Sequence, residues 1–238
     1  MREGKVVLIM QARMGSTRLP GKSLMPLAGK PLVEQLILRV KRCKKVDLIV
    51  LATTEKVQDD PLCDIAARLG IEVYRGSEND LVERYYQAAV HYNATFIVRL
   101  PADNPVAEPG EIDRIIDHYV HSDDDFSANT HNILGNEYPD GLGAEVFSLE
   151  KLTEVRGLTT DPRNREHPHT YFYDHPEKFK IGTVQCPAAF RRPDLVLDVN
   201  TQEEYQFIAE LYAYLFPRNP EFHITDIITW YDSIYRSH

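Results

Sequence analysis

The sequence contains no run of 18 apolar residues, so no segment is long and apolar enough to predict a membrane-spanning helix. The N-terminal stretch has only one short apolar run, Val6 to Met10, which is shorter than the apolar region of a secretory signal peptide. The three cysteines, Cys43, Cys63 and Cys186, are odd in number and widely spaced, which fits neither a disulfide framework nor a zinc site. We therefore expect a cytoplasmic protein.

Positive charge is also scarce. The chain has 27 Lys and Arg against 36 Asp and Glu, a formal net charge of −9, which argues against nucleic acid or an anionic membrane as the main partner. No Gly-x-Ser-x-Gly motif predicts a serine nucleophile, and no cysteine lies in an electropositive, glycine-bearing turn. With 43% hydrophobic residues, the 238 residues can bury the core of one α/β domain, and we expect a single domain over 1–238.

One stretch departs from this acidic background: residues 11–22, QARMGSTRLPGK, which we call the phosphate loop. It contains no acid, but it has three cations, two hydroxyls and two glycines, namely Arg13, Arg18, Lys22, Ser16, Thr17, Gly15 and Gly21. An apolar run precedes it and a helical pattern beginning at Pro31 follows, as in the phosphate-binding turns of α/β sheets. Glycines let backbone N–H groups approach phosphate oxygens, and guanidinium groups bind those oxygens in pairs. The loop therefore predicts a site for a polyanion such as a triphosphate.

Two familiar phosphate-binding motifs do not match this loop. The P-loop needs Gly-x-x-x-x-Gly-Lys-Ser/Thr, whereas here Gly15 and Gly21 are six residues apart and only Gly21-Lys22-Ser23 agrees. The dinucleotide fingerprint Gly-x-Gly-x-x-Gly is absent. For any single cation of the loop, a basic surface turn remains an alternative.

Strand and helix patterns alternate over the first hundred residues. Apolar runs predict strands at 6–10, 47–53, 71–74 and 95–100. Helical spacing predicts helices at 31–40, 60–69 and 79–92. This order indicates a Rossmann-like, mostly parallel sheet with helices on both faces, which binds ligands at the carboxyl ends of its strands. Residues at the ends of these strands are therefore candidates for ligand contacts: Thr53, Thr54, Arg75 and Gly76.

The regular alternation of strand and helix patterns ends after a predicted helix at 111–121. We expect strands at 126–130, 143–147, 180–185 and 194–199. We expect Ser148 to cap a helix. A capping box at Thr201–Glu204 predicts the start of a second helix, which ends near Phe216, and a last helix is predicted at 224–234. Irregular polar stretches inside such a domain usually form specificity loops or an oligomer arm, so we expect 126–193 to be an inserted acceptor-binding and dimerisation segment.

Two aspartates lie at or just past apolar runs: Asp103 in RLPADNP and Asp198 in LVLDVNT. A buried carboxylate needs a cation or a hydrogen-bond partner. Either residue alone is typical of a helix or turn cap. Beside a triphosphate site, however, Mg²⁺ is usually held by one or two carboxylates together with phosphate oxygens. We predict that Asp103 and Asp198 hold Mg²⁺.

Two other clusters are weaker candidates for metal sites. His167 and His169 are two residues apart with Pro168 between them, a spacing that does not place both on one helix face. The run Asp123–Asp125 is more typical of a solvated turn. We expect neither cluster to bind metal.

The motifs together resemble the cytidylyltransferases that make CMP-activated sugar acids, including the 3-deoxy-manno-octulosonate and acylneuraminate enzymes. Most similar is the bacterial branch associated with spore-coat and surface polysaccharide synthesis. The resemblance covers nearly the whole chain and rests on QARMGSTRLPGK, LATTEKVQDDPL, YRGSENDLVERYYQAA, YPDGLGAEVFS, REH at 165–167, and LDVNTQEE.

The resemblance implies a GT-A-like fold, as in nucleotide-diphospho-sugar transferases, and a homodimer; it also supports CTP as the donor and Mg²⁺ as the cofactor. The predicted nucleotide contacts are Gln11, Ala12, Arg13, Gly15, Ser16, Thr17, Arg18, Lys22, Thr53, Thr54, Arg75 and Gly76. The predicted acceptor contacts are Tyr138, Asp140, Gly141, Glu145, Arg165, Glu166 and His167, although 138–141 could also be only a turn. Pro101 stands where the family usually has a hydroxyl or amide residue, which leaves the acceptor open.

The predicted reaction is attack by an acceptor oxygen on the α-phosphorus of CTP with loss of pyrophosphate. Arg13, Lys22 and Asp103 are the expected catalytic residues. The small anionic acceptor could be an acidic sugar, a phosphate or a phosphonate. A GT-A glycosyltransferase is a further alternative, although it normally has an Asp-x-Asp pair. A nucleotide-binding sensor or scaffold is disfavoured, because both metal aspartates and all cations of the loop are present.

Overall fold

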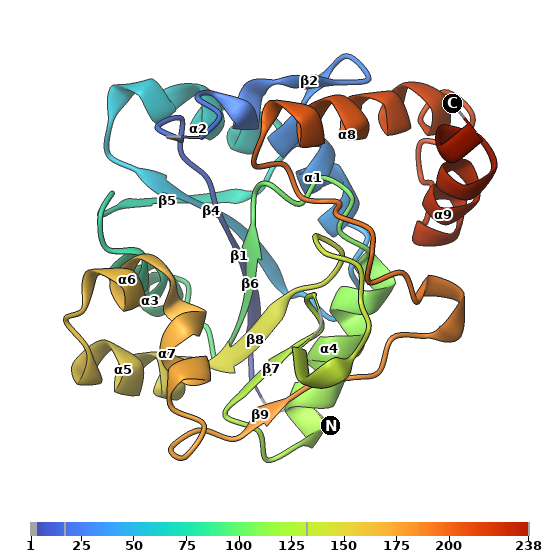
Figure 1. The fold of residues 1–238 in the computed structure, drawn as a ribbon. Coiled ribbons are helices and arrows are strands. Elements are labelled where there is room, and N and C mark those ends of the chain that lie inside the picture. Colours follow the sequence, from blue (N-terminus) through green and yellow to red (C-terminus); the bar gives the residue numbers. More distant parts are fainter. Residues whose placement is uncertain (1–3, 17, 132, 238) are drawn as a thin grey trace.

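A seven-stranded sheet forms the centre of the computed structural model, which describes residues 4–16, 18–131 and 133–237 (Figure 1). Its strands are β1 (Val6–Gln11), β4 (Leu48–Thr54), β5 (Glu72–Gly76), β6 (Phe96–Pro101), β7 (Phe126–Ala128), β8 (Glu145–Ser148) and β9 (Ile181–Gly182). They are ordered β5-β4-β1-β6-β8-β7-β9. β1 pairs parallel with β4 and β6, whereas β8 runs antiparallel to β6 and β7. The predicted mostly parallel α/β sheet is confirmed.

Helices cover both faces of the sheet. They are α1 (Leu32–Val40), α2 (Asp60–Arg68), α3 (Leu81–His91), α4 (Pro109–His121), α5 (Leu149–Leu158), α6 (Pro162–Glu166), α7 (Pro168–Asp174), α8 (Gln202–Leu215) and α9 (Ile224–Ser233). Alternate residues of β1 face opposite sides: Leu8 packs with α1, α2 and α4, and Ile9 with α3, α5 and α7. A third cluster lies under α8 and α9.

Side-chain caps begin several helices as the sequence predicts. The Ser148 hydroxyl accepts a hydrogen bond from the Lys151 N–H at the start of α5. Thr201 and Glu204 form the expected capping box of α8. Asp80 caps α3, which begins at Leu81, two residues later than predicted. Every helix in the described part of the chain is too short or too polar to span a membrane.

The predicted strand at 180–185 is only partly confirmed, and the predicted strand at 194–199 is wrong. Only Ile181–Gly182 joins the sheet, as β9. Residues 194–199 instead run beside the 138–142 loop, where the Leu197 N–H donates to the Asp140 carbonyl oxygen. Their alternating apolar side chains are buried against the α8–α9 cluster, which explains why they looked like a strand. The charged stretch after residue 160 forms α6 and α7, which the pattern did not predict.

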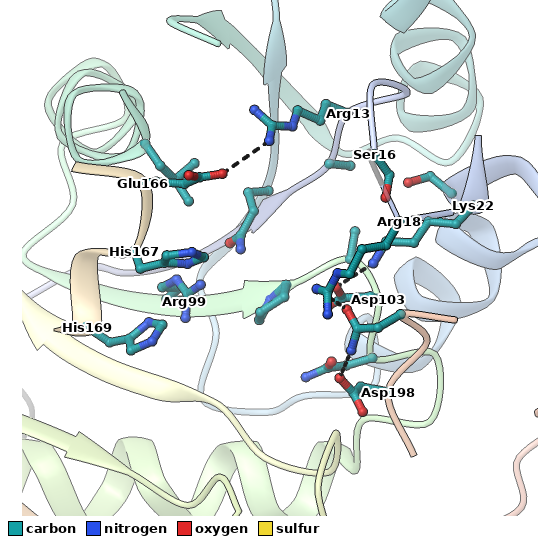
Figure 2. A pocket seen from close by; sticks show the side chains of 18 of the residues that line it. Arg13, Ser16, Arg18, Lys22, Arg99, Asp103, Glu166, His167, His169 and Asp198 are labelled. Atoms are coloured by element: carbon teal, nitrogen blue, oxygen red, sulfur yellow. Dashed lines mark hydrogen bonds and ion pairs between the residues drawn. The ribbon is translucent and has the colours of Figure 1, made fainter. Parts of the chain in front are cut away.

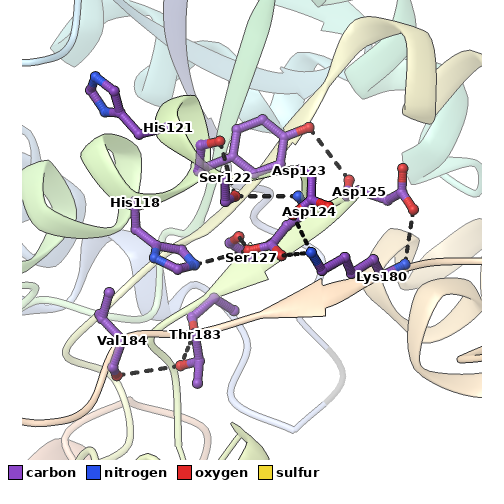
Figure 3. Close-up of polar contacts among 12 residues, drawn as sticks. His118, His121, Ser122, Asp123, Asp124, Asp125, Ser127, Lys180, Thr183 and Val184 are labelled. Carbon is purple, nitrogen blue, oxygen red and sulfur yellow. Dashed lines mark hydrogen bonds and ion pairs between the residues drawn. The ribbon is translucent and has the colours of Figure 1, made fainter.

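The acidic run Asp123–Asp125 is only partly the solvated turn that we expected (Figure 3). The Asp123 side chain is exposed, but that of Asp124 is 6% exposed. Asp124 accepts a hydrogen bond from the Ser127 hydroxyl and contacts the His118 ring at 2.9 Å. Asp125 accepts one from the Lys180 N–H. The run therefore joins the end of α4 to the residue that precedes β9.

Candidate active site

A cavity of about 780 Å³ opens at the carboxyl ends of β1 and β6 (Figure 2). This is the edge where parallel sheets bind ligands. Residues that the sequence singled out supply much of its lining: Gln11, Ala12, Arg13, Ser16, Arg18, Lys22, Asp103, Asp140, Glu145, Glu166, His167 and Asp198. The fold thus brings together residues that are up to 187 positions apart in the chain.

The three cations of the phosphate loop all line this cavity. The Lys22 ammonium lies 2.7 Å from Asp103 Oδ2 and donates to the Val199 carbonyl oxygen at 2.8 Å. Arg18 donates to the side chain of Asn200. Arg13 donates to the Glu78 carbonyl oxygen at 3.0 Å, and its other terminal nitrogen lies 3.4 Å from Glu166. One short loop therefore contributes three cationic side chains to the cavity lining.

The two predicted metal ligands also lie in this cavity. Burial, together with the negative charge of Asp140 and Asp103, raises the pKa of Asp198 to about 6. Such an environment fits a divalent cation, because the cation would relieve the repulsion between carboxylates. Within the described residues, no group of three or more His, Cys, Asp or Glu side chains is placed to hold a metal ion. Mg²⁺ bound by Asp103 and Asp198 would therefore take further ligands from phosphate oxygens and water.

Comparison with known proteins agrees with this geometry. A family model described as cytidylyltransferase matches residues 7–224. The chain belongs to the cytidylyltransferase family. It is similar to the spore coat polysaccharide biosynthesis protein SpsF of Bacillus subtilis, with 32% identity over 229 residues that cover 94% of this chain and 92% of SpsF. The resemblance noted in the sequence is thus confirmed.

Two further relatives support the assignment. The structure of a cytidylyltransferase from Leptospira borgpetersenii serovar Hardjo-bovis superposes with a TM-score of 0.90 and 31% identity, over 98% of this chain and 96% of that one. A 3-deoxy-manno-octulosonate cytidylyltransferase of Anaeromyxobacter dehalogenans is 34% identical over 113 residues, which cover 47% of this chain and 46% of that enzyme.

The phosphate loop of this cytidylyltransferase is held by an aspartate that the sequence analysis missed. Asp59 is fully buried and accepts hydrogen bonds from the Met14 N–H at 2.7 Å and from the N–H and hydroxyl of Thr54. It thereby joins the loop after β1 to the end of β4. The motif LATTEKVQDDPL contains Asp59, but an aspartate beside a helix start looks like an ordinary cap.

We expect Asp59→Ala to lower the free energy of unfolding by about 3 kcal/mol, since three donors lose a charged acceptor. The same change should weaken CTP binding, because Met14 would no longer be fixed. Urea unfolding and a CTP titration measure the two effects. The matched control is Asp60→Ala: Asp60 is half exposed and pairs with Arg75, so its loss should change stability by less than about 1 kcal/mol. Equal effects in both variants would contradict this role of Asp59.

Several predicted nucleotide contacts lie outside the cavity. Thr53 is fully buried, and Thr54 bonds to Asp59. Arg75 turns away to Asp60 and to the carbonyl oxygens of residues 54 and 56. Gly15 and Gly76 are likewise absent from the lining. Thr17 lies outside the described residues.

Three predicted acceptor contacts are absent from the lining of the cavity. The Tyr138 side chain is fully buried and hydrogen-bonded to Glu111 and Arg114. Arg165 pairs with Asp80 at the start of α3, and so it holds α6 against α3. Gly141 has φ of 77°, and a Cβ there would lie 2.6 Å from the Asp198 backbone nitrogen. Gly141 therefore supports the position of Asp198 without lining the cavity.

The cavity also contains residues that the sequence analysis did not select, above all Arg99 and His169. Arg99 lies opposite Glu145 in the β6–β8 pair, and its Nη1 donates to both Glu145 oxygens at 2.8 Å. One signal could have revealed it: a charged residue in the middle of the apolar run IVRLP. His169 lies in α7, with its Nδ1 3.5 Å from Glu145 Oε1.

Burial lowers the pKa of His169 to about 4, below the value near 6.5 of an unfolded histidine. Above pH 6.5 the His169 ring is neutral in both the folded and the unfolded protein. As the pH falls from 6.5 toward 4, the unfolded protein binds a proton at this ring and the folded protein does not, so the free energy of unfolding decreases. The full loss amounts to about 3 kcal/mol. We expect His169→Gln to lose less stability than wild type between pH 7 and pH 4.5, measured by urea unfolding. His121→Gln, at an exposed position of α4, is the control. Parallel curves of unfolding free energy against pH for wild type and His169→Gln would contradict the prediction.

Proposed function

We propose that this cytidylyltransferase transfers CMP from CTP to an acidic sugar or a related anionic acceptor, with Mg²⁺ and release of pyrophosphate, in surface polysaccharide or glycoconjugate synthesis. One observation carries the proposal: the cations of the phosphate loop and the carboxylates of Asp103 and Asp198 line the same cavity. Phosphoryl transfer depends mainly on positioning and charge neutralisation, which such a set of side chains provides.

In this proposal the triphosphate lies against the phosphate loop. Arg13 and Arg18 bind phosphate oxygens, and Lys22 neutralises charge on the departing pyrophosphate. Only 14% of the Lys22 side chain is exposed, and its ammonium group lies in the cavity beside Asp103. Backbone N–H groups of the loop supply further donors.

Asp103 and Asp198 would hold Mg²⁺, whose charge, when bound, neutralises phosphate oxygens and lowers the pKa of a hydroxyl nucleophile. The acceptor oxygen forms a new bond to the α-phosphorus while the bond to the pyrophosphate oxygen breaks. The pyrophosphate leaves with the bonding electron pair. The chain's own part is to hold acceptor and triphosphate in line.

The names of two relatives support the acceptor class. SpsF is named for spore coat polysaccharide biosynthesis, and the Anaeromyxobacter enzyme for 3-deoxy-manno-octulosonate, a sugar acid. Such an acceptor needs its hydroxyl group ionised, whereas a phosphate or phosphonate arrives ionised. The predicted homodimer through residues 126–193 and the cytoplasmic location remain expectations.

A thermal-shift panel tests the donor. We expect CTP with Mg²⁺ to raise the melting temperature more than ATP, GTP or UTP does, and CTP without Mg²⁺ to have less effect. At a ligand concentration 100 times Kd, the expected stabilisation is about 2.7 kcal/mol. An equal response to all four nucleotides, or no response, would contradict CTP as the donor.

A further inference from the structure

Two cations of the phosphate loop hold the two carboxylates that are predicted to bind metal (Figure 2). Lys22 Nζ lies 2.7 Å from Asp103 Oδ2. Arg18 donates to the side-chain oxygen of Asn200 at 2.6 Å, and the Asn200 amide in turn donates to Asp198. All five residues line the cavity. The groups proposed to bind the triphosphate therefore contact the groups proposed to bind the metal ion, directly in one case and through one amide in the other.

The Lys22 ammonium lies between two oxygen atoms. Besides Asp103 Oδ2 it contacts the Val199 carbonyl oxygen, at 2.8 Å. Carboxylate and carbonyl oxygens are also the ligands that hard divalent cations take. Both members of the ion pair are partly shielded from water, with 14% of the Lys22 side chain and 22% of the Asp103 side chain exposed. The ammonium therefore contacts the same kinds of oxygen atom that a cation bound by Asp103 would need.

Lys22 and a metal ion cannot share Asp103 Oδ2 without strong repulsion. Mg²⁺ binds carboxylate oxygens at about 2 Å. Because the ammonium nitrogen is 2.7 Å from the same oxygen, the two positive charges would lie within about 5 Å of each other, where repulsion between poorly solvated charges is large. Lys22 must therefore leave Asp103 when a metal ion binds to this oxygen, and a triphosphate is an anion that can receive its charge.

We propose that Lys22 competes with the divalent cation for Asp103, so that metal binding at Asp103 depends on a triphosphate that attracts Lys22 away. This proposal rests on the proposed function and adds a coupling between nucleotide and metal binding. The stem of a lysine is flexible, so the ammonium can turn from Asp103 toward phosphate oxygens. The binding of either ligand then favours the binding of the other by the same factor.

The first test measures the affinity for metal in the absence of nucleotide. Mn²⁺ is the probe, because it takes oxygen ligands as Mg²⁺ does and its free ion is detected by electron paramagnetic resonance. Lys22→Met should bind Mn²⁺ roughly tenfold more tightly than wild type. In an Asp103→Asn background, Lys22→Met should give no such gain over Asp103→Asn alone. The melting temperature of each variant shows whether it is folded.

Arg13→Met is the matched control for charge. It removes one positive charge from the same cavity, but Arg13 contacts Glu78 and Glu166 and neither of the predicted metal ligands. The affinity of this variant for Mn²⁺ should stay within about twofold of wild type, because charges that make no direct contact are screened by water and salt. The proposal is overturned if Arg13→Met gains as much affinity as Lys22→Met, or if the gain persists without the Asp103 carboxylate.

The second test follows Lys22 itself through its ammonium ¹H–¹⁵N signal, which is assigned by its loss in Lys22→Met. CTP is added to the full chain together with EDTA, which removes divalent ions. It should shift the Lys22 signal saturably, whereas CMP, which lacks the β- and γ-phosphates, should shift it less. An unchanged signal at CTP concentrations that raise the melting temperature would show that the triphosphate does not displace Lys22, and would overturn the proposal.

Failure of the proposed function would look different. CTP with Mg²⁺ would then neither raise the melting temperature nor release pyrophosphate in the presence of a sugar acid. The Mn²⁺ measurements contain no nucleotide, so they would still show whether Lys22 competes with a cation for Asp103.

Discussion

Asp103→Ala should reduce CTP-dependent pyrophosphate release by about a thousandfold or more while the protein stays folded. The Asp103 carboxylate lies in the cavity with 22% of its side chain exposed, so its removal opens no hole in the core. The variant would lose a proposed Mg²⁺ ligand and the partner of Lys22 at once. Both losses raise the energy of the charged transition state. Initial rates of pyrophosphate release at saturating CTP and Mg²⁺, with a sugar acid such as 3-deoxy-manno-octulosonate as the acceptor, measure the effect.

Neighbouring and remote aspartates provide the comparison for that experiment. Asp198→Asn should reduce turnover in the same direction, because it keeps the shape of the side chain and removes its charge. Asp64→Ala, at an exposed position of α2, should leave turnover unchanged. The melting temperature of each variant shows whether it is folded. Near-normal turnover in folded Asp103→Ala would rule out the assignment of Asp103 as an essential metal ligand.

The sequence predicts this site well where the chemistry is local. Arg13, Arg18 and Lys22 lie within one loop between a strand and a helix, so their shared direction follows from the topology of a parallel sheet. Asp103 follows β6, which lies next to β1, and so reaches the same cavity. Thr53 and Arg75, which lie near the carboxyl ends of β4 and β5, do not line the cavity. Thr53 is fully buried and Arg75 pairs with Asp60, so neither side chain is directed into the cavity, although residues that follow β5, such as Glu78 and Asn79, do line it.

The cavity-lining residues of β6, β8 and α7 could not be predicted from the sequence to lie together. Arg99 meets Glu145 only because β8 inserts antiparallel beside β6, a pairing of residues 46 positions apart that no local pattern reveals. His169 reaches the cavity because α7 packs against α5 and, through Phe172, against Phe147 of β8. For Arg165 the family resemblance implied an acceptor contact, and the structure shows an ion pair with Asp80 that the sequence pattern did not reveal. Whether a charged residue has a protein partner depends on tertiary contacts, and those decide between structural and binding roles.

Lys22→Met should reduce pyrophosphate release by about a hundredfold or more, because a methionine of similar length fills the space but cannot stabilise charge on the leaving group. Lys22→Arg should restore only part of the activity. The ammonium lies between Asp103 Oδ2 and the Val199 carbonyl oxygen, at 2.7 and 2.8 Å, and the larger planar guanidinium group does not fit that position equally well. The measurement is kcat with CTP at saturating Mg²⁺.

Lys30→Met is the matched control, since Lys30 lies outside the cavity, is 41% exposed and pairs with Glu34. It should keep full turnover. A Lys22→Met variant that turns over within a few fold of wild type would show that Lys22 only holds Asp103, and that Arg13 and Arg18 suffice for the triphosphate. If instead kcat falls while the affinity for CTP is kept, the Lys22 ammonium acts mainly in the transition state. That result would distinguish a catalytic charge from one that merely binds the nucleotide.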